Sequence, residues 1–199
     1  MRFFTSPTSP YGRMAHVALL EKGVAFELSM VDPWADDAGL REVNPATRVP
    51  ALVLDDGIAL SETSVILSWL EREFPRPALF GDARCLRRAG LAIGVIDAAV
   101  QTIIGRKATA PTLFDDTPLG LRRRRAMVEG MQGLELQVQR DCAGAAAAHA
   151  ELDVIASVVA LDYLQFRFAE APWRVPTPAL DAWVAQLRRR PAFADTLPR

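Results

Sequence analysis

The feature that most restricts the fold of this chain is a change in hydrophobic periodicity across the proline-rich segment FPRPALFG, residues 74–81. Before this segment, short runs with the period of a strand alternate with helical stretches. After it we expect only helices, at residues 84–108, 119–142, 152–169 and 177–189. A chain of 199 residues can hold two small domains with separate cores. The sequence therefore predicts an α/β domain over residues 1–76 and an all-helical domain over residues 82–199.

The first domain shows a definite order of elements. The run RFFT, which begins at Arg2, predicts a strand, and residues 13–22 predict a helix that stops at Gly23, a residue typical of helix C-termini. Apolar residues then recur at every second position over 24–30, the strand period. Two β-rich runs flank the hairpin signal Asp55-Asp56-Gly57, and the stretch SETSVILSWLEREF predicts a helix with Ser61 or Thr63 as its cap. The predicted order is βαβ, then ββα.

Composition narrows the possible partners and the compartment. Lys plus Arg (23) nearly balances Asp plus Glu (24), so we expect no nucleic-acid partner and no anionic membrane surface. The run of arginines at 122–125 fits a solvated or salt-bridged helix face, or else a polyanion site. We expect no signal peptide and no apolar stretch near the roughly 18 residues that span a bilayer. Cys85 and Cys142 lie far apart in the sequence, so we expect both to be ordinary helix residues and neither to belong to a metal site or a disulfide. A reducing cytoplasm is therefore the expected compartment.

The stretch SPYG, residues 9–12, begins the first helix and allows two interpretations. Ser9 before Pro10 is a good helix N-cap, because the serine oxygen satisfies backbone donors and Pro fits the first turn. The same position faces a cluster of backbone N–H groups, where an anion binds favourably. The residues alone leave both interpretations open.

The order of these motifs resembles the glutathione transferase family over nearly the whole chain. The strongest local match is NPATRVPALVLDDGIALSETSVILSWLE, residues 44–71, which is similar to the family pattern NP-x-G-K-VP-x-L … ES-x-AI-x-x-YL. The stretch from DVIASVVALDYLQFRF to RRRPAF is similar to a small bacterial subgroup of these transferase-like proteins. The resemblance implies a thioredoxin-like N-terminal domain, a C-terminal helical bundle and a homodimer.

The chain departs from the family pattern at three places. Thr47-Arg48 stands where the family often has Gly-Lys, and Glu62-Thr63 stands where it has Glu-Ser. Ala150 replaces the Ser or Thr that forms a capping box ahead of Asp153, a loss of about 1 kcal/mol unless another group satisfies those amides. We expect Asp153 to anchor the start of its helix.

The resemblance assigns the chemistry to a hydroxyl group. SPYG stands where thioredoxin-like redox proteins have Cys-x-x-Cys, so this chain has no thiol for disulfide exchange there. The resemblance implies instead that Ser9 donates a hydrogen bond to the thiolate of bound glutathione, the co-substrate, which then attacks a small apolar electrophile. Thr8 is the competing hydroxyl and Tyr11 a more distant one. The alternative that Ser9 is only a helix N-cap, with no catalytic hydroxyl in the protein, stays open.

The resemblance also implies a set of glutathione-binding groups. Val49, joined to Pro50 by a cis peptide bond, would present its N–H and C=O to the cysteinyl part. Glu62 would accept a hydrogen bond from the γ-glutamyl ammonium, while the N–H and hydroxyl of Thr63 bind the adjacent carboxylate. Arg48 and Trp34 would approach the glycine end or stay in solvent.

These residues predict a cytoplasmic glutathione transferase that detoxifies a small hydrophobic compound. The electrophile would lie near Ser9 and Ile103, Ile104 and Lys107, while His16 and His149 receive no role. The alternative is a non-catalytic protein that binds glutathione or another ligand, since the Ser9 site would look the same. A protein-interaction module without glutathione is disfavoured by the intact Val49-Pro50 and Glu62-Thr63 pieces.

Overall fold

The computed structural model describes residues 1–141 and 149–199, which form two compact units. The first unit comprises Met1–Gly81, His149–Glu151 and Arg190–Arg199. The second comprises Asp82–Ala148 and Leu152–Arg189. The predicted boundaries 1–76 and 82–199 stay predictions. The low-complexity segment AGAAAAHA, residues 143–150, favours a loop or a frayed helix end; its part 143–148, together with Cys142, lies outside the described residues.

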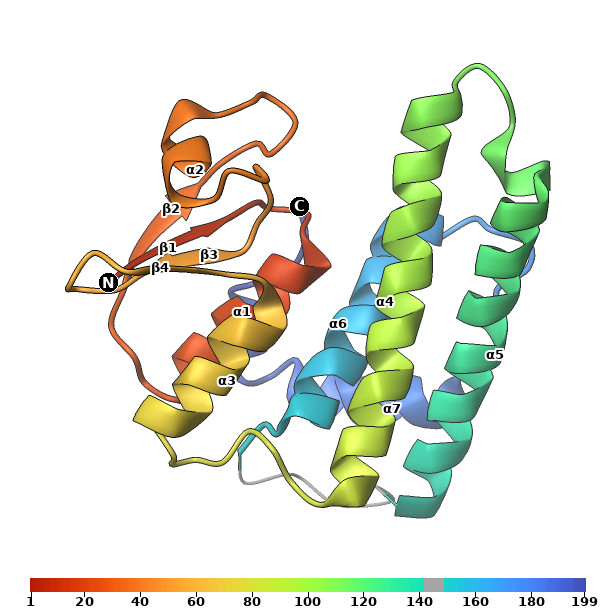
Figure 1. Cartoon of the computed structure of the whole chain (residues 1–199). Helices are drawn as coiled ribbons and strands as arrows, with labels where there is room; N and C mark the ends of the chain where they lie inside the picture. Colours follow the sequence, from red (N-terminus) through yellow and green to blue (C-terminus); the bar gives the residue numbers. More distant parts are fainter. Residues whose placement is uncertain (142–148) are drawn as a thin grey trace. The chain divides into compact units, whose positions relative to one another are not determined.

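The first unit is a four-stranded mixed sheet covered by helices (Figure 1). The strand order is β2-β1-β3-β4, with β1 parallel to β2 and antiparallel to β3, and β3 antiparallel to β4. This is the predicted thioredoxin-like βαβ-ββα order. The elements are β1 (Arg2–Thr5), α1 (Pro10–Glu21), β2 (Glu27–Met30), α2 (Ala38–Val43), β3 (Ala51–Val53), β4 (Ala59–Ser61) and α3 (Thr63–Glu73).

Two consecutive phenylalanines of β1 build the two faces of the sheet, because successive strand residues point to opposite sides. Phe3 is fully buried, and its ring lies 5.6 Å from that of His16 on α1 and 5.7 Å from that of Phe26. Phe4 packs with Leu40 of α2 in a second cluster. In Figure 1, α1 and α3 lie together on one face of the sheet and α2 lies on the other.

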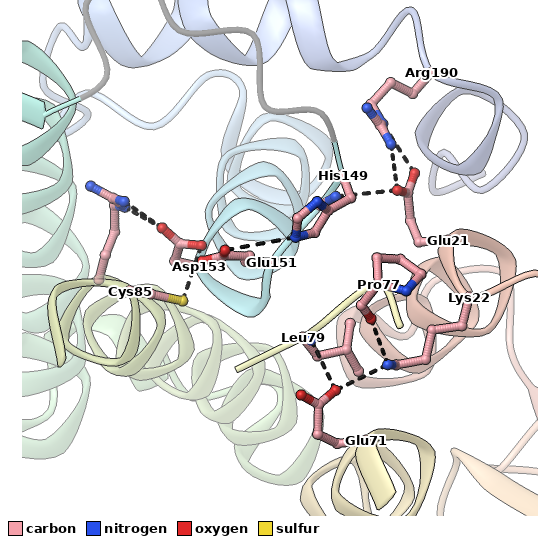
Figure 2. Close-up of polar contacts among 12 residues, drawn as sticks. Glu21, Lys22, Glu71, Pro77, Leu79, Cys85, His149, Glu151, Asp153 and Arg190 are labelled. Carbon is pink, nitrogen blue, oxygen red and sulfur yellow. Dashed lines mark hydrogen bonds and ion pairs between the residues drawn. The ribbon is translucent and has the colours of Figure 1, made fainter. Parts of the chain in front are cut away.

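The last residues of the chain pack along α1. The short helix α8 (Pro191–Ala194) contacts α1. The buried Arg13 donates from Nη2 to the Phe193 carbonyl (3.3 Å) and from Nε to Thr196 Oγ1 (3.2 Å). At the other end of α1, Arg190 binds the Glu21 carboxylate, with Nε 3.1 Å from Oε1 (Figure 2). These contacts fix the orientation of α1, whose N-cap residue is Ser9.

The Ala150 N–H donates to Glu21 Oε2 at 3.2 Å. In a capping box this N–H would bond the acidic side chain three residues on, while the Ser or Thr would accept from an amide of the first helical turn. Glu21 therefore replaces only one half of the capping box, and the acceptor lost with the Ser or Thr is not replaced by this contact.

A buried lysine holds the proline-rich segment after α3. Lys22 Nζ donates to Glu71 Oε2 (3.0 Å) and to the carbonyls of Phe74 and Pro77, the latter at 2.7 Å (Figure 2). Burial alone would raise the pKa of Glu71, but the Leu79 N–H and Lys22 both bind its carboxylate and lower that pKa overall. The segment is therefore tied to the ends of α1 and α3.

The second unit is a helical bundle built on α4 and α6 (Figure 1). Its helices agree with the predicted ranges to within two residues. They are α4 (Ala83–Thr109), α5 (Pro118–Asp141), α6 (Leu152–Phe168) and α7 (Pro178–Leu187), with the 3₁₀ turn η1 (Phe114–Asp116) between α4 and α5. The fold class, an α/β domain followed by an all-α domain, is confirmed.

Helix α4 corrects one expectation from the sequence. By length and composition alone it is apolar enough to cross a membrane, although we expected no such stretch. It packs against both α5 and α6, as the central helix of a bundle does. A core helix passes the same test, and the expected absence of a membrane partner stays a prediction.

Two buried aspartates of the second unit are paired with arginines. Asp153, in the first turn of α6, accepts from Arg88 Nε (2.7 Å) and from Cys85 Sγ (3.3 Å), both on α4. Asp162 binds Arg188, whose Nε lies 2.8 Å from Oδ1. Asp153 thus anchors its helix start through α4, and Cys85 is a buried helix residue.

Two of the four arginines at 122–125 make local polar contacts. Arg125 Nε lies 4.0 Å from Glu129 one turn along the helix, and Arg124 donates to the Asp115 carbonyl (3.2 Å). For Arg125 the salt-bridged helix face is the interpretation that fits, whereas Arg124 binds a backbone carbonyl.

Candidate functional site

The strand register brings the sequence-predicted residues of the first unit to one edge of the sheet. Phe4 pairs with Ala51, and Ala51 pairs with Ser61. The end of β1, the start of β3 and the end of β4 therefore meet at this edge. The residues just beyond these strand ends are the Ser9 loop, the Arg48–Pro50 segment and Glu62 with Thr63.

Ser9 is the N-cap of α1, as predicted. Its Oγ accepts from the Gly12 N–H at 3.0 Å, and Pro10 occupies the first turn. Gly12 is required at its position for a separate reason: a Cβ there would lie 2.0 Å from Thr5 Oγ1 at the end of β1. Ser9 and Thr8 are both half-buried. Because Ser9 Oγ only accepts in its capping bond, the bond leaves its hydroxyl proton for another acceptor.

The Val49–Pro50 peptide bond is cis, as the resemblance implied. A buried side chain that the sequence analysis did not single out organises the turn before it. Asn44 Nδ2 donates to the Arg48 carbonyl (2.8 Å), and Asn44 Oδ1 accepts from the Ala46 N–H (3.2 Å). The pair Asn-Pro at 44–45 was the available signal, since Asn before Pro favours a turn.

The start of α3 differs from the prediction. The N-cap is Glu62, not Ser61 or Thr63, and the Glu62 side chain makes no capping hydrogen bond. Glu62 has φ +72°, in the left-handed region that costs a non-glycine residue of order 1–3 kcal/mol. Such strain gathers at ligand clamps. An uncapped helix start carries backbone donors and a positive partial charge, which suit an anion.

Thr63 uses its hydroxyl within the protein. Its Oγ1 donates to the Tyr11 carbonyl at 3.1 Å, which ties the start of α3 to the first turn of α1. With its proton donated there, the hydroxyl has none left for a carboxylate ligand, and the Thr63 N–H becomes the group to consider.

Arg48 and Glu62 form an ion pair across this edge. Both side chains are exposed, at 68 % for Arg48 and 52 % for Glu62. Thr47, which precedes Arg48, also has a positive φ of +50°. Trp34 follows β2 and is 60 % exposed. The edge therefore offers an anion site at α3, a carboxylate and a guanidinium that are paired with each other, and the Ser9 hydroxyl.

The predicted electrophile-contacting residues belong to the other unit. Ile103, Ile104 and Lys107 lie on α4, and their contribution stays a prediction. His16, to which no role was assigned, is part of the aromatic packing under the sheet, and burial lowers its pKa.

Comparisons with known proteins point to one family. The sequence model of the glutathione S-transferase N-terminal domain matches residues 8–73. An uncharacterized GST-like protein of Escherichia coli is 29 % identical over 203 positions, which cover 100 % of this chain and 98 % of that protein.

Two solved structures are similar over nearly their whole lengths. A glutathione S-transferase of Methylobacterium radiotolerans in complex with glutathione sulfonate has a TM-score of 0.83 and 32 % identity, with 99 % of this chain and 94 % of that chain covered. A glutathione transferase family member of Pseudomonas fluorescens with bound glutathione has a TM-score of 0.83 and 31 % identity, with 100 % and 98 % covered.

Proposed function

This chain belongs to the glutathione S-transferase family, and we propose that it binds glutathione at the sheet edge of its first unit and conjugates it to a small apolar electrophile. The observation that carries the proposal is the convergence at one edge of the Ser9 hydroxyl, the Val49–Pro50 segment and the start of α3, whose N-cap side chain makes no capping bond. Each of these features suits a different part of the peptide.

The γ-glutamyl end would bind at the start of α3. Its carboxylate would accept from the Thr63 N–H, where the helix partial charge favours an anion. Its ammonium would reach the Glu62 carboxylate. The Val49 N–H and C=O, presented by the cis bond, would pair with the cysteinyl backbone in between. This arrangement leaves the thiol directed toward Ser9.

Ser9 would stabilise the thiolate as a hydrogen-bond donor. A hydrogen bond to a charged group contributes about 1.5–3 kcal/mol, enough to lower the pKa of a thiol from about 8.5 to about 7. The start of α1 adds a few tenths to about 1 kcal/mol in the same direction. The bound thiolate, and not Ser9, is then the nucleophile that attacks the electrophile.

Retention on immobilised glutathione, followed by calorimetric titration, tests the binding part of the proposal. We expect a single site per chain and turnover of an activated aryl chloride followed by absorbance. Glu62→Gln should weaken glutathione binding, while the matched Glu129→Gln on the exposed face of α5 should not. A protein that is folded but does not bind glutathione contradicts the proposal.

One observation favours a second candidate. Ser9 already has a structural task as the cap of α1, so a protein that binds glutathione without activating it is the alternative. Binding with no change in the thiol pKa would identify such a carrier. The expected homodimer, cytoplasmic location, detoxification role and lack of metal or nucleic-acid partners stay predictions.

A further inference from the structure

We propose that Arg48 occupies the ammonium site on Glu62 when no ligand is bound, so that glutathione must displace it. This inference rests on the proposed function and concerns how the site discriminates among ligands. Its starting point is the Arg48–Glu62 ion pair. The proposed function gives Glu62 to the γ-glutamyl ammonium, and the family resemblance gives Arg48 to the glycine end or to solvent.

The backbone holds this pair in place from both sides. The register Ala51 with Ser61 sets the end of β4 opposite the start of β3. Asn44, only 6 % exposed, binds the Arg48 carbonyl and so fixes the turn that carries the guanidinium. Glu62 and Thr47, the residue before Arg48, both have positive φ angles. Two strained non-glycine positions thus lie beside this exposed ion pair, whereas the exposed pair Arg41–Asp36 has one, Asp36 itself with φ +50°. Such strain concentrates at ligand clamps.

The exchange follows from charge. Glu62 has a carboxylate that can pair with one cation at full strength, and the γ-glutamyl ammonium competes with Arg48 for it. When the ammonium binds, the guanidinium is released into solvent at the same edge. Glutathione carries a second carboxylate at its glycine end, and a planar guanidinium binds a carboxylate through two parallel hydrogen bonds. Arg48 therefore weakens the binding of the γ-glutamyl ammonium and strengthens the binding of the glycine carboxylate.

In this exchange the glycine carboxylate offsets the loss of the Arg48–Glu62 ion pair. A ligand that has the ammonium but lacks this charge must break the Arg48–Glu62 pair with no compensating contact. An exposed ion pair changes an equilibrium constant by no more than about fivefold. The expected discrimination is therefore modest, and it depends on a single residue.

Calorimetric titration with glutathione and with its glycine monoethyl ester tests this exchange. In the Arg48→Gln variant we expect the ester to bind about two- to fivefold more tightly than in the parent. The preference for glutathione over the ester should fall by a similar factor. The direction is informative, because the ester with its thiol protonated is a zwitterion without net charge, so the loss of a positive charge from the site would not by itself tighten its binding.

Arg41→Gln is the matched control, because Arg41 also forms an exposed ion pair, with Asp36. It should leave both dissociation constants unchanged. Ester binding that is unchanged or weaker in Arg48→Gln overturns the exchange, and so does an equal tightening in Arg41→Gln. If the parent binds neither compound, the proposed function itself fails, which is a separate result.

Discussion

The starts of α3 and α7 both have backbone N–H groups without a partner inside the helix, but within the described part of the chain a carboxylate accepts from them only at α7. Neither helix has a side-chain cap of its own. At α7, the buried Glu135 of α5 accepts from the N–H groups of Ala179 (3.0 Å) and Leu180 (2.8 Å). At α3, no hydrogen bond from a side chain of residues 1–141 or 149–199 reaches the first amides, and the N-cap residue Glu62 is strained and exposed. The protein thus supplies its own anion to one helix, and we infer that it leaves the other for a ligand.

The largest expected effect comes from removing the internal anion. Glu135→Ala should lower the free energy of unfolding by about 3 kcal/mol, because one buried and one half-buried amide lose a charged acceptor. Urea unfolding followed by circular dichroism measures the loss. Glu129→Ala on the same helix is the control, since its exposed pair with Arg125 is worth less than about 1 kcal/mol. A loss below about 1 kcal/mol for Glu135→Ala would show that α7 does not depend on this carboxylate.

The corresponding change at α3 should separate stability from binding. Glu62→Gly relieves the positive φ but gives the unfolded chain more freedom, so the free energy of unfolding should stay equal or rise by about 1 kcal/mol. Glutathione affinity should fall about tenfold, because the ammonium loses its carboxylate. Urea unfolding and calorimetry give both numbers on one preparation. Lower stability with unchanged affinity would make Glu62 a structural residue like Glu135. This result would contradict the difference drawn between the starts of α3 and α7.

The smallest expected effect is a pH dependence of the first unit. Burial between Phe3 and Phe26 lowers the pKa of His16 in the folded protein. Below about pH 6.5, the ordinary value, the unfolded chain takes up this proton more readily than the folded chain. Stability should therefore fall as the pH decreases from about 6.5 toward the lower folded pKa, and it should be fully present above 6.5.

Unfolding at pH 7.5, 6.5 and 5.5 in the parent and in His16→Phe checks this contribution. The variant should lose part of the decline at low pH, while His149→Gln, at a half-exposed histidine, should retain it. If His16→Phe and the parent have the same pH profile, burial of His16 does not set this dependence. The experiment also defines the pH range in which the Ser9 site can be titrated on a folded protein.

The features of the site that the sequence predicted correctly are local in the chain. The Ser9 cap, the helix stop at Gly23 and the hairpin around Gly57 each follow from a few adjacent residues. The cis Val49–Pro50 bond came from the family resemblance and not from the residues themselves, since an X-Pro bond is cis in only about 5–6 % of cases.

The features that the sequence did not predict depend on partners far along the chain. Glu135 lies 45 residues from Leu180, and no local pattern indicates that its carboxylate reaches α7. The identity of the α3 cap was wrong for a related reason. Ser61 and Thr63 are better cap residues by type, but Ser61 pairs with Ala51 in the sheet and Thr63 binds the Tyr11 carbonyl, which leaves Glu62 at the N-cap. Tertiary contacts overrode residue preference at this position.

The most direct test of the account is the thiol pKa of bound glutathione, measured by thiolate absorbance against pH in the parent and in Ser9→Ala. Thr8→Val, at the competing hydroxyl, is the control. We predict a pKa well below about 8.5 in the parent and in Thr8→Val, and a return toward the free value in Ser9→Ala. Bound glutathione that keeps its free pKa in the parent and in Ser9→Ala would contradict the account and make Ser9 a helix cap only.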